Sequence, residues 1–177
     1  WVIGTGMSWL TLTLGNLFLM GKGEGLDLRT FLILTGMILI NSLFYAAASY
    51  LLTLFVHSQS AWSAILSIVN TLVGFLGAVY LPMTMLPEKV GMVLKVLPVL
   101  HGASMMRRVS MQGALADTFA GLPAQVAERY SEGMGITVSV KGEVFSIATQ
   151  IIFVILLSVV LSIVSAMISV KRSAKER

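Results

Sequence analysis

The chain has 177 residues, of which 56% are hydrophobic and 11% are charged, and its mean hydropathy is +0.90. Ordinary soluble domains do not reach this composition, so the sequence indicates a membrane protein. The net charge is +4, but the charges are confined to a few segments, which argues against a nucleic-acid partner. The chain has no cysteine, which excludes a disulfide framework, a thiolate metal site and a cysteine nucleophile.

Four continuous apolar stretches are long enough to cross a bilayer core of about 30 Å as helices. They cover residues 2–20, 31–56, 62–81 and 147–170. The runs do not alternate, and open strands in lipid would leave backbone groups unpaired, so we predict an all-α, polytopic helical membrane protein. The first stretch begins at Trp1 without a charge and lacks the features of a signal peptide, so we expect further sequence before it.

The spans and the segments between them predict three parts. Residues 1–81 hold three transmembrane helices, residues 82–145 form an outer segment of re-entrant or interfacial helices, and residues 146–177 hold the last span and a basic tail. That tail, Lys171–Arg177, has four cations and one anion, which predicts a cytoplasmic C-terminus under the positive-inside rule. Counting back through the spans places residues 57–61 inside, and residues 21–29 and 82–145 outside.

Small and weakly polar residues form stripes along the spans. On the third span they follow a helical spacing and share one face: Ser63, Ser67, Asn70, Gly74 and Gly77. Similar faces on the first and last spans consist of Gly4, Ser8, Thr11 and Gly15, and of Ser158, Ser162, Ser165 or Ala166, and Ser169. Such faces let helix backbones approach closely. The third-span stripe predicts either simple helix packing or the wall of a pathway or subunit interface. Asn41 and Tyr45, one turn apart on the second span, could likewise hydrogen-bond a neighbouring helix or touch cargo.

The outer segment begins with closely spaced prolines. We expect Pro82 and Pro87 to interrupt the third helix as it nears the outer surface, and the apolar face that continues to Pro98 to return to the membrane interface. These three prolines are therefore candidates for an outer gate. Farther along, we expect a polar helix over residues 114–130, cut by Gly121 and Pro123, and a short strand over residues 136–140.

Several kinds of chemistry have no residues to support them. The predicted spans contain no ionisable side chain in their interior, so proton-coupled transport by this chain alone is disfavoured. A phosphate-binding Gly-x-x-x-x-Gly-Lys-[Ser/Thr] loop is absent from the sequence, so any nucleotide site belongs to another subunit. Methionines cluster around His101, but their irregular spacing argues against a metal site. We predict no catalytic residue, metal ligand or cofactor on this chain, and we expect His101 to be a hydrogen-bonded interfacial residue.

The order Gly77, Leu81-Pro82, Leu86-Pro87, Leu97-Pro98 and Arg107 resembles the permease subunits of type-2 ABC exporters, in which the fifth span ends in a proline-containing outer segment. Gly25-Leu-Asp-Leu28 before a long apolar helix is similar to the outer turn and fourth span of that family. The resemblance implies that the four spans are the third to sixth of six. It also places the coupling helix before residue 1.

The same resemblance implies a homodimer or paired half-transporter in the bacterial plasma membrane. A separate cytoplasmic subunit would bind ATP and Mg²⁺, and the cargo would be an amphipathic compound, a lipid-linked polymer or a peptide. Two other functions stay open on the residues alone. A membrane scaffold or assembly protein would use the same small-residue stripes, whereas a membrane-embedded enzyme would need a nucleophile and base that we do not find.

Overall fold

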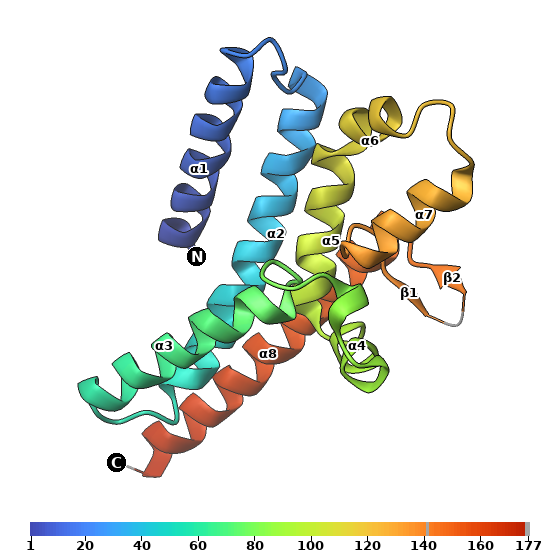
Figure 1. The fold of residues 1–177 in the computed structure, drawn as a ribbon. Helices are drawn as coiled ribbons and strands as arrows, with labels where there is room; N and C mark the ends of the chain where they lie inside the picture. Colours follow the sequence, from blue (N-terminus) through green and yellow to red (C-terminus); the bar gives the residue numbers. More distant parts are fainter. Residues whose placement is uncertain (141, 176–177) are drawn as a thin grey trace.

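The computed structural model describes residues 1–140 and 142–175, and its elements are helical apart from one small hairpin (Figure 1). The long helices are α1 (Val2–Met20), α2 (Leu28–Thr53), α3 (Gln59–Leu76) and α8 (Ile147–Lys175). The connection between α3 and α8 holds η1 (Met83–Met85), α4 (Glu88–Leu94), α5 (Pro98–Ser110), α6 (Gln112–Thr118), α7 (Ala124–Gly133), β1 (Ser139–Val140) and β2 (Glu143–Val144). We call residues 77–146 the α3–α8 connection.

Within the described residues, α1, α2, α3 and α8 are the helices that are long and apolar enough to cross a membrane. This confirms the all-α class and the four predicted spans, although the bounds of three spans differ. Helix α2 starts earlier than predicted because Asp27 caps it: the Asp27 carboxylate accepts a hydrogen bond from the Thr30 amide at 3.2 Å. This interaction with Thr30 also lowers the pKa of the Asp27 carboxyl. Ser58 caps α3 in the same way through the Ala61 amide.

The end of α3 corrects the predicted role of the prolines. The helix stops at Leu76, six residues before Pro82, in a turn where Ala78 adopts a left-handed φ of 52°. The Ala78 amide donates to the Phe75 carbonyl and the Val79 amide to the Gly74 carbonyl, which is the Schellman pattern of helix termination. The helix is therefore ended by this turn and not by the prolines.

The prolines instead begin the helices that follow. Pro82 and Pro87 are the N-cap residues of η1 and α4, and Pro98 lies in the first turn of α5. The fixed φ of proline and its missing amide suit these positions, where no intrahelical partner is available for an N–H group. Pro123 caps α7 in the same way, and the predicted polar helix over residues 114–130 is indeed cut into α6 and α7.

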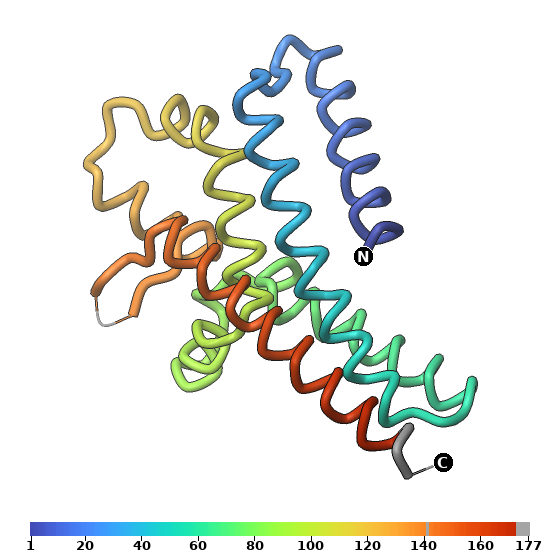
Figure 2. The backbone as a smooth tube through the Cα atoms, turned by 180° about the vertical axis from the view of Figure 1, so that it is seen from behind, coloured from blue at the N-terminus to red at the C-terminus, as the bar shows by residue number. Residues whose placement is uncertain are grey.

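Helix α2 lies at the centre of the fold and packs against α1, α5 and α8 (Figures 1 and 2). The α2–α3 turn and the C-terminal end of α8 lie at the same end of the molecule. There the Arg172 guanidinium donates to the Leu54 carbonyl and lies 5.8 Å from the centre of the Phe55 ring. Arg172, near the start of the basic tail, and residues 57–61 are therefore on one side, as the charge pattern predicts. The α1–α2 turn and α6 lie at the opposite end.

The most extensive contact in the fold is between α2 and α8. The buried face of α8 includes Val154, Ser158 and Ser165, which are all fully buried, whereas Ser162 is exposed. On α2, Ala47 is buried as well. Small side chains let two helices approach closely where lipid provides no hydrophobic drive for their association. The stripe predicted on the last span is thus used for packing at two of its positions.

Helix α5 runs beside the N-terminal half of α2 and the start of α8. Fully buried Met105 packs with Leu34 and Met37, and Ile147 and Ile151 pack against this cluster. Farther down, Gly102 meets Asn41, which lies roughly 20 Å along α2 from Leu28 at 1.5 Å per residue. The start of α5 therefore lies about halfway along α2.

A second apolar cluster holds the rest of the connection together. Ala78, Leu94, Leu100 and Val138 form its buried part, so the end of α3, α4, α5 and the start of the hairpin share one small core. Strand β1 pairs with β2 in antiparallel register, with Ser139 opposite Val144. The strand predicted over residues 136–140 is thus limited to two residues.

Candidate functional site

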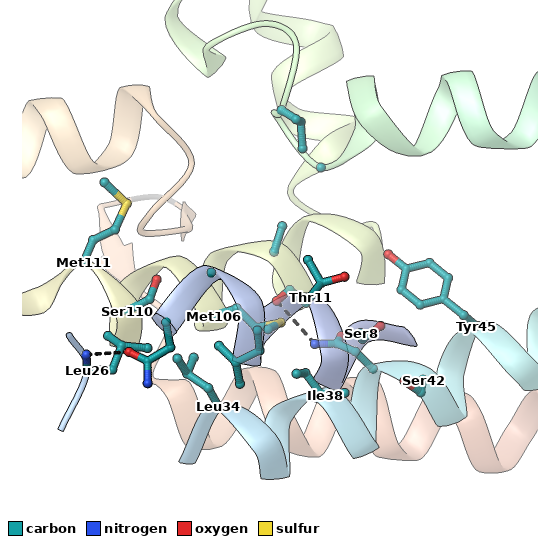
Figure 3. A pocket seen from close by; sticks show the side chains of 18 of the residues that line it. Ser8, Thr11, Leu26, Leu34, Ile38, Ser42, Tyr45, Met106, Ser110 and Met111 are labelled. Carbon is teal, nitrogen blue, oxygen red and sulfur yellow. Dashed lines mark hydrogen bonds between the residues drawn. The ribbon is translucent and has the colours of Figure 1, made fainter. Parts of the chain in front are cut away.

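A groove of about 860 Å³ lies between α1, α2, the end of α3 and α5 (Figure 3). Aliphatic and thioether side chains form much of its wall. Its polar lining consists of hydroxyl and amide side chains, namely Ser8, Thr11, Asn16, Asn41, Ser42, Tyr45 and Ser110. Among the described residues that line the groove there is no Lys, Arg, Asp, Glu or His. Such a wall is suited to amphipathic molecules.

Three of the predicted pathway residues meet in this groove. Asn41 and Tyr45 contribute from α2, and Gly77 contributes from the end of α3. Tyr45 is 37% exposed, and its side chain extends along the groove in Figure 3. On α1, Ser8, Thr11 and Gly15 line the same groove, so most of the stripe predicted on the first span faces it.

The third-span stripe is divided by the structure. Ser63, Ser67 and Asn70 are exposed and do not line the groove, whereas Gly74 and Gly77 are buried. Gly74 lies beneath the ring of Tyr80, which folds back over the end of α3, and a Cβ at this position would overlap the Tyr80 ring. The tight contact at Gly74 is therefore made within the chain's own helix end.

The closest approach of α2 and α5 occurs at Asn41. The Asn41 amide nitrogen lies 3.5 Å from the Gly102 carbonyl oxygen, to which it donates. A Cβ on Gly102 would overlap the Asn41 side-chain oxygen. Glycine at position 102 is thus required for this contact, which also places a buried amide beside the groove. Asn41 thus hydrogen-bonds a neighbouring helix, which is one of the two possibilities that the sequence left open.

Asn16 and Ser42 were missed by our sequence analysis. The Asn16 side-chain oxygen accepts a hydrogen bond from the Leu26 amide at 2.7 Å, which joins the end of α1 to the α1–α2 turn. Ser42 is buried beside Asn41. Asn16 follows Gly15 and Ser42 follows Asn41, two residues that the sequence did single out. A polar side chain within an apolar run was the signal that could have found both.

Arg107 connects two parts of the α3–α8 connection. Its guanidinium donates to the Ala78 carbonyl at 3.1 Å and to the Met134 carbonyl at 3.3 Å. Burial lowers the pKa of Arg107, but a guanidinium keeps its proton in proteins. Arg108 donates to the Phe145 carbonyl at 3.1 Å. These two arginines therefore hold the turn after α3, the turn after α7 and the start of α8 to one helix.

His101 departs in part from its predicted role. Its Nε2 atom donates to the Lys95 carbonyl at 2.9 Å, but its buried Nδ1 atom has no hydrogen-bond partner among the residues that the structure describes. The rings of Phe145 and Phe153 lie against it at centroid distances of 5.6 and 5.0 Å. Burial lowers the pKa of His101, so the neutral form is favoured. His101 is therefore a half-satisfied residue inside the connection and does not line the groove.

A second cavity, of about 630 Å³, lies inside the connection. Helices η1 and α4 form one side, the C-terminal half of α7 forms the other, and residues 137–139 close it. We call it the connection pocket. Unlike the groove, it is lined by charged side chains, which are Glu88, Lys95, Arg129 and Glu132.

The four apolar helices define a multi-pass membrane protein. An uncharged groove lies between α1, α2, the end of α3 and α5. A family described as "ABC-2 family transporter protein" matches residues 1–167. The chain belongs to this family, as the resemblance at the prolines and Arg107 implied, and is a transporter permease subunit. No curated protein and no solved structure matches the chain.

Proposed function

We propose that the chain is the permease subunit of an ATP-driven exporter, paired with a second permease copy or homologue in the bacterial plasma membrane. A separate cytoplasmic subunit would bind ATP and Mg²⁺ and hydrolyse the nucleotide. The absence of ionisable side chains from the interior of the predicted spans supports an external energy source, because a proton-coupled pathway needs such groups.

The observation that carries the proposal is the groove. Weakly polar residues from α1 and α2 line it together with the end of α3 and α5, so a substrate in it would contact both spanning helices and the connection. Its mixed lining suits cargo with apolar and polar parts. In this proposal Asn41, Tyr45 and Gly77 belong to the pathway wall.

The α3–α8 connection is proposed as the outer gate. The cationic tail supports a cytoplasmic C-terminus, and the connection lies at the other end of α8. Pro82, Pro87 and Pro98 each begin a separate short helix, so the connection is made of short packed pieces and not of one continuous rod. Such pieces can shift against one another as units, which a gate requires.

Reconstitution of the purified permease with its ATPase subunit in proteoliposomes tests the proposal. We expect ATP-dependent export of an amphipathic reporter dye, and we expect Thr11→Trp to reduce the export rate because Thr11 lines the groove. Leu10→Trp is the matched control, since Leu10 is the neighbouring exposed residue outside the groove. Equal rates in the two variants would contradict the pathway role. A complex that binds ATPase but never exports would favour the scaffold function.

The chain lacks native cysteine, which makes its orientation testable. Single cysteines at Ser60, Ser131 and Ser173 can be treated with an impermeant thiol reagent in intact cells. The proposed orientation requires that Ser131→Cys be labelled and that the other two be protected. Labelling of Ser173→Cys would reverse the orientation and place the connection inside.

A further inference from the structure

The connection pocket has a feature that the export pathway does not explain. Two helix faces meet across it, and each face carries one anion, one cation and one glycine. On α4 and its C-cap residue these are Glu88, Lys95 and Gly91, and on α7 they are Glu132, Arg129 and Gly133.

The spacing places each set on one side of its helix. On α4, Glu88, Gly91 and Lys95 follow one another at three and four residues, so they lie on the same face. Arg129 and Glu132 are one turn apart on α7. Glu88, Arg129 and Glu132 are exposed and Lys95 is half-buried, so all four heads can be reached by a ligand.

The two glycines have different consequences for the pocket. A Cβ on Gly133 would lie 2.8 Å from a methyl carbon of Thr84, so this glycine lets α7 and η1 approach closely at one end. A Cβ on Gly91 would meet only the terminal carbon of Met83, at 3.9 Å. Gly91 therefore leaves unfilled space between the two charges of α4.

The inner surface of the pocket is apolar. Met83 and Leu86, which are half-buried, form its reachable apolar floor, and they pack on the buried Leu100 and Val138. The hydroxyl groups of Thr84, Thr137 and Ser139 also line it. A ligand would thus meet an apolar floor, hydroxyl groups and a rim with balanced charge.

We propose that the connection pocket binds a zwitterionic amphiphile. An apolar part would cover the floor at Met83 and Leu86. Its cationic group would meet Glu88 or Glu132, and its anionic group would meet Lys95 or Arg129. A purely anionic or purely cationic head would leave two like charges facing it, which disfavours both. This chemistry is shared by a phosphoethanolamine lipid head and by an amino-acid head on an acyl chain.

As a release site for exported cargo, the pocket rests on the proposed export function and on the outer placement of the connection. Binding of a zwitterionic amphiphile does not depend on export, because it can be measured on the complex without nucleotide. The two can therefore fail separately.

The test uses the permease–ATPase complex in nanodiscs, with a bimane fluorophore on a single cysteine at Met92, which lines the pocket and is largely exposed. The probes are lysophosphatidylethanolamine and Nε-lauroyl-lysine. The controls are lysophosphatidylglycerol, which lacks the cation, and glycerophosphoethanolamine, which lacks the tail. We expect a saturable fluorescence change with at least one of the two zwitterionic probes, and the probe that binds identifies the source of the head group.

Substitutions decide whether the response comes from the pocket. Gly91→Leu should fill the space and weaken binding at least about tenfold, and Arg129→Gln and Glu132→Gln should each weaken it by about tenfold. Gly113→Leu and Glu128→Gln are the matched controls, since Gly113 has no neighbour within 4 Å and neither residue lines the pocket. Equal binding in Gly91→Leu, or equal binding of lysophosphatidylglycerol, would overturn the proposal.

ATP-dependent export measured on the same samples separates the two proposals. Export without zwitterion binding would overturn the pocket proposal and leave the permease function standing. Binding without export would support the pocket as a site and count against the export function.

Discussion

Helices α2 and α8 differ from α1 and α3 in how they use small residues. The first two form the dense part of the fold, with Asn41, Ala47, Ser158 and Ser165 all buried. Helix α1 has no buried residue, and Gly74 is the one buried residue of α3. Both pairs carry stripes of serine, threonine and glycine, but the stripe of α1 lies on the groove and that of α8 lies in a helix contact. A small-residue stripe therefore predicts a helix face with little side-chain bulk, but not whether a groove or another helix lies against it.

The dense side should be the most sensitive to added volume. Ser158 is fully buried, and its hydroxyl donates to the Val154 carbonyl at 2.7 Å. Ser158→Leu adds bulk where two helices meet, so we expect a loss of stability of about 3 kcal/mol, at the upper end of overpacking effects. Thermal unfolding of the purified protein in nanodiscs measures it. Ser162→Leu, at an exposed position one turn away, should leave the melting temperature nearly unchanged. Equal losses of stability in the two variants would contradict the dense packing of α8 at Ser158.

The contact between α2 and α5 should be nearly as sensitive. Gly102→Val drives a branched side chain into Asn41, so we expect a loss of about 2 kcal/mol. Gly113→Ala is the control, because its added methyl group meets nothing within 4 Å and should stabilise α6 by up to about 1 kcal/mol. The double variant Asn41→Ala with Gly102→Ala should recover part of the stability that Gly102→Ala alone loses. Additive losses in this cycle would contradict a direct contact.

The arginine link within the connection should come next. Arg107→Gln removes charge-assisted hydrogen bonds to the Ala78 and Met134 carbonyls, so we expect a loss of about 1.5–2 kcal/mol. Limited proteolysis between α6 and β1 should accelerate more than cleavage of the α1–α2 turn. Arg129→Gln removes a cation from α7 without touching these carbonyls, and it should leave both cleavage rates unchanged. Equal proteolysis rates for Arg107→Gln and the parent protein would contradict a stabilising role of Arg107 in the connection.

The smallest effect is expected on the sparse side, at Gly74. Gly74→Ala should push the Tyr80 ring away and loosen the turn after α3, at a cost of about 1 kcal/mol. Adding Tyr80→Ala should relieve that overlap, although it also removes the Tyr80 contact with Phe75 at 5.3 Å. If the double variant is no more stable than Gly74→Ala alone, Gly74 makes a contact outside its own helix end. Helix α3 would then be part of the densely packed side with α2 and α8.

The sequence was sufficient to predict the parts of the fold that depend on hydrophobic length. The four spans follow from the apolar runs, because lipid enforces backbone hydrogen bonding within each span. The break between α6 and α7 follows from Gly121 and Pro123. The end of α3 could not be predicted, since alanine rarely adopts the left-handed conformation that Ala78 has. Its apolar sequence continues to Leu81, so hydropathy alone extends the helix too far.

The site was predicted in part for a related reason. Asn41, Tyr45 and Gly77 were found because polar or small residues stand out in apolar runs, and all three line the groove. Ser63, Ser67 and Asn70 stand out equally, but they are exposed. Helical periodicity defines a face and not its neighbour, and the neighbour depends on tertiary packing. The connection pocket was missed because its charges come from α4 and α7, which are far apart in the chain.

The contact between α2 and α8 also sets the order of assembly during synthesis. All of α3 and the connection lie between Thr53 and Ile147, and at ~5–20 residues per second the ribosome needs roughly 5–20 s to produce them. During that interval α8 is absent throughout, and Asn41 has no α5 to cover it until Ser110 has been added. Helix α2 is therefore held in the membrane or at the insertion machinery while the polar side chains of Asn41 and Ser42 are not yet buried. Slower elongation through the connection would prolong this exposure, and we expect the yield of folded protein to fall with it.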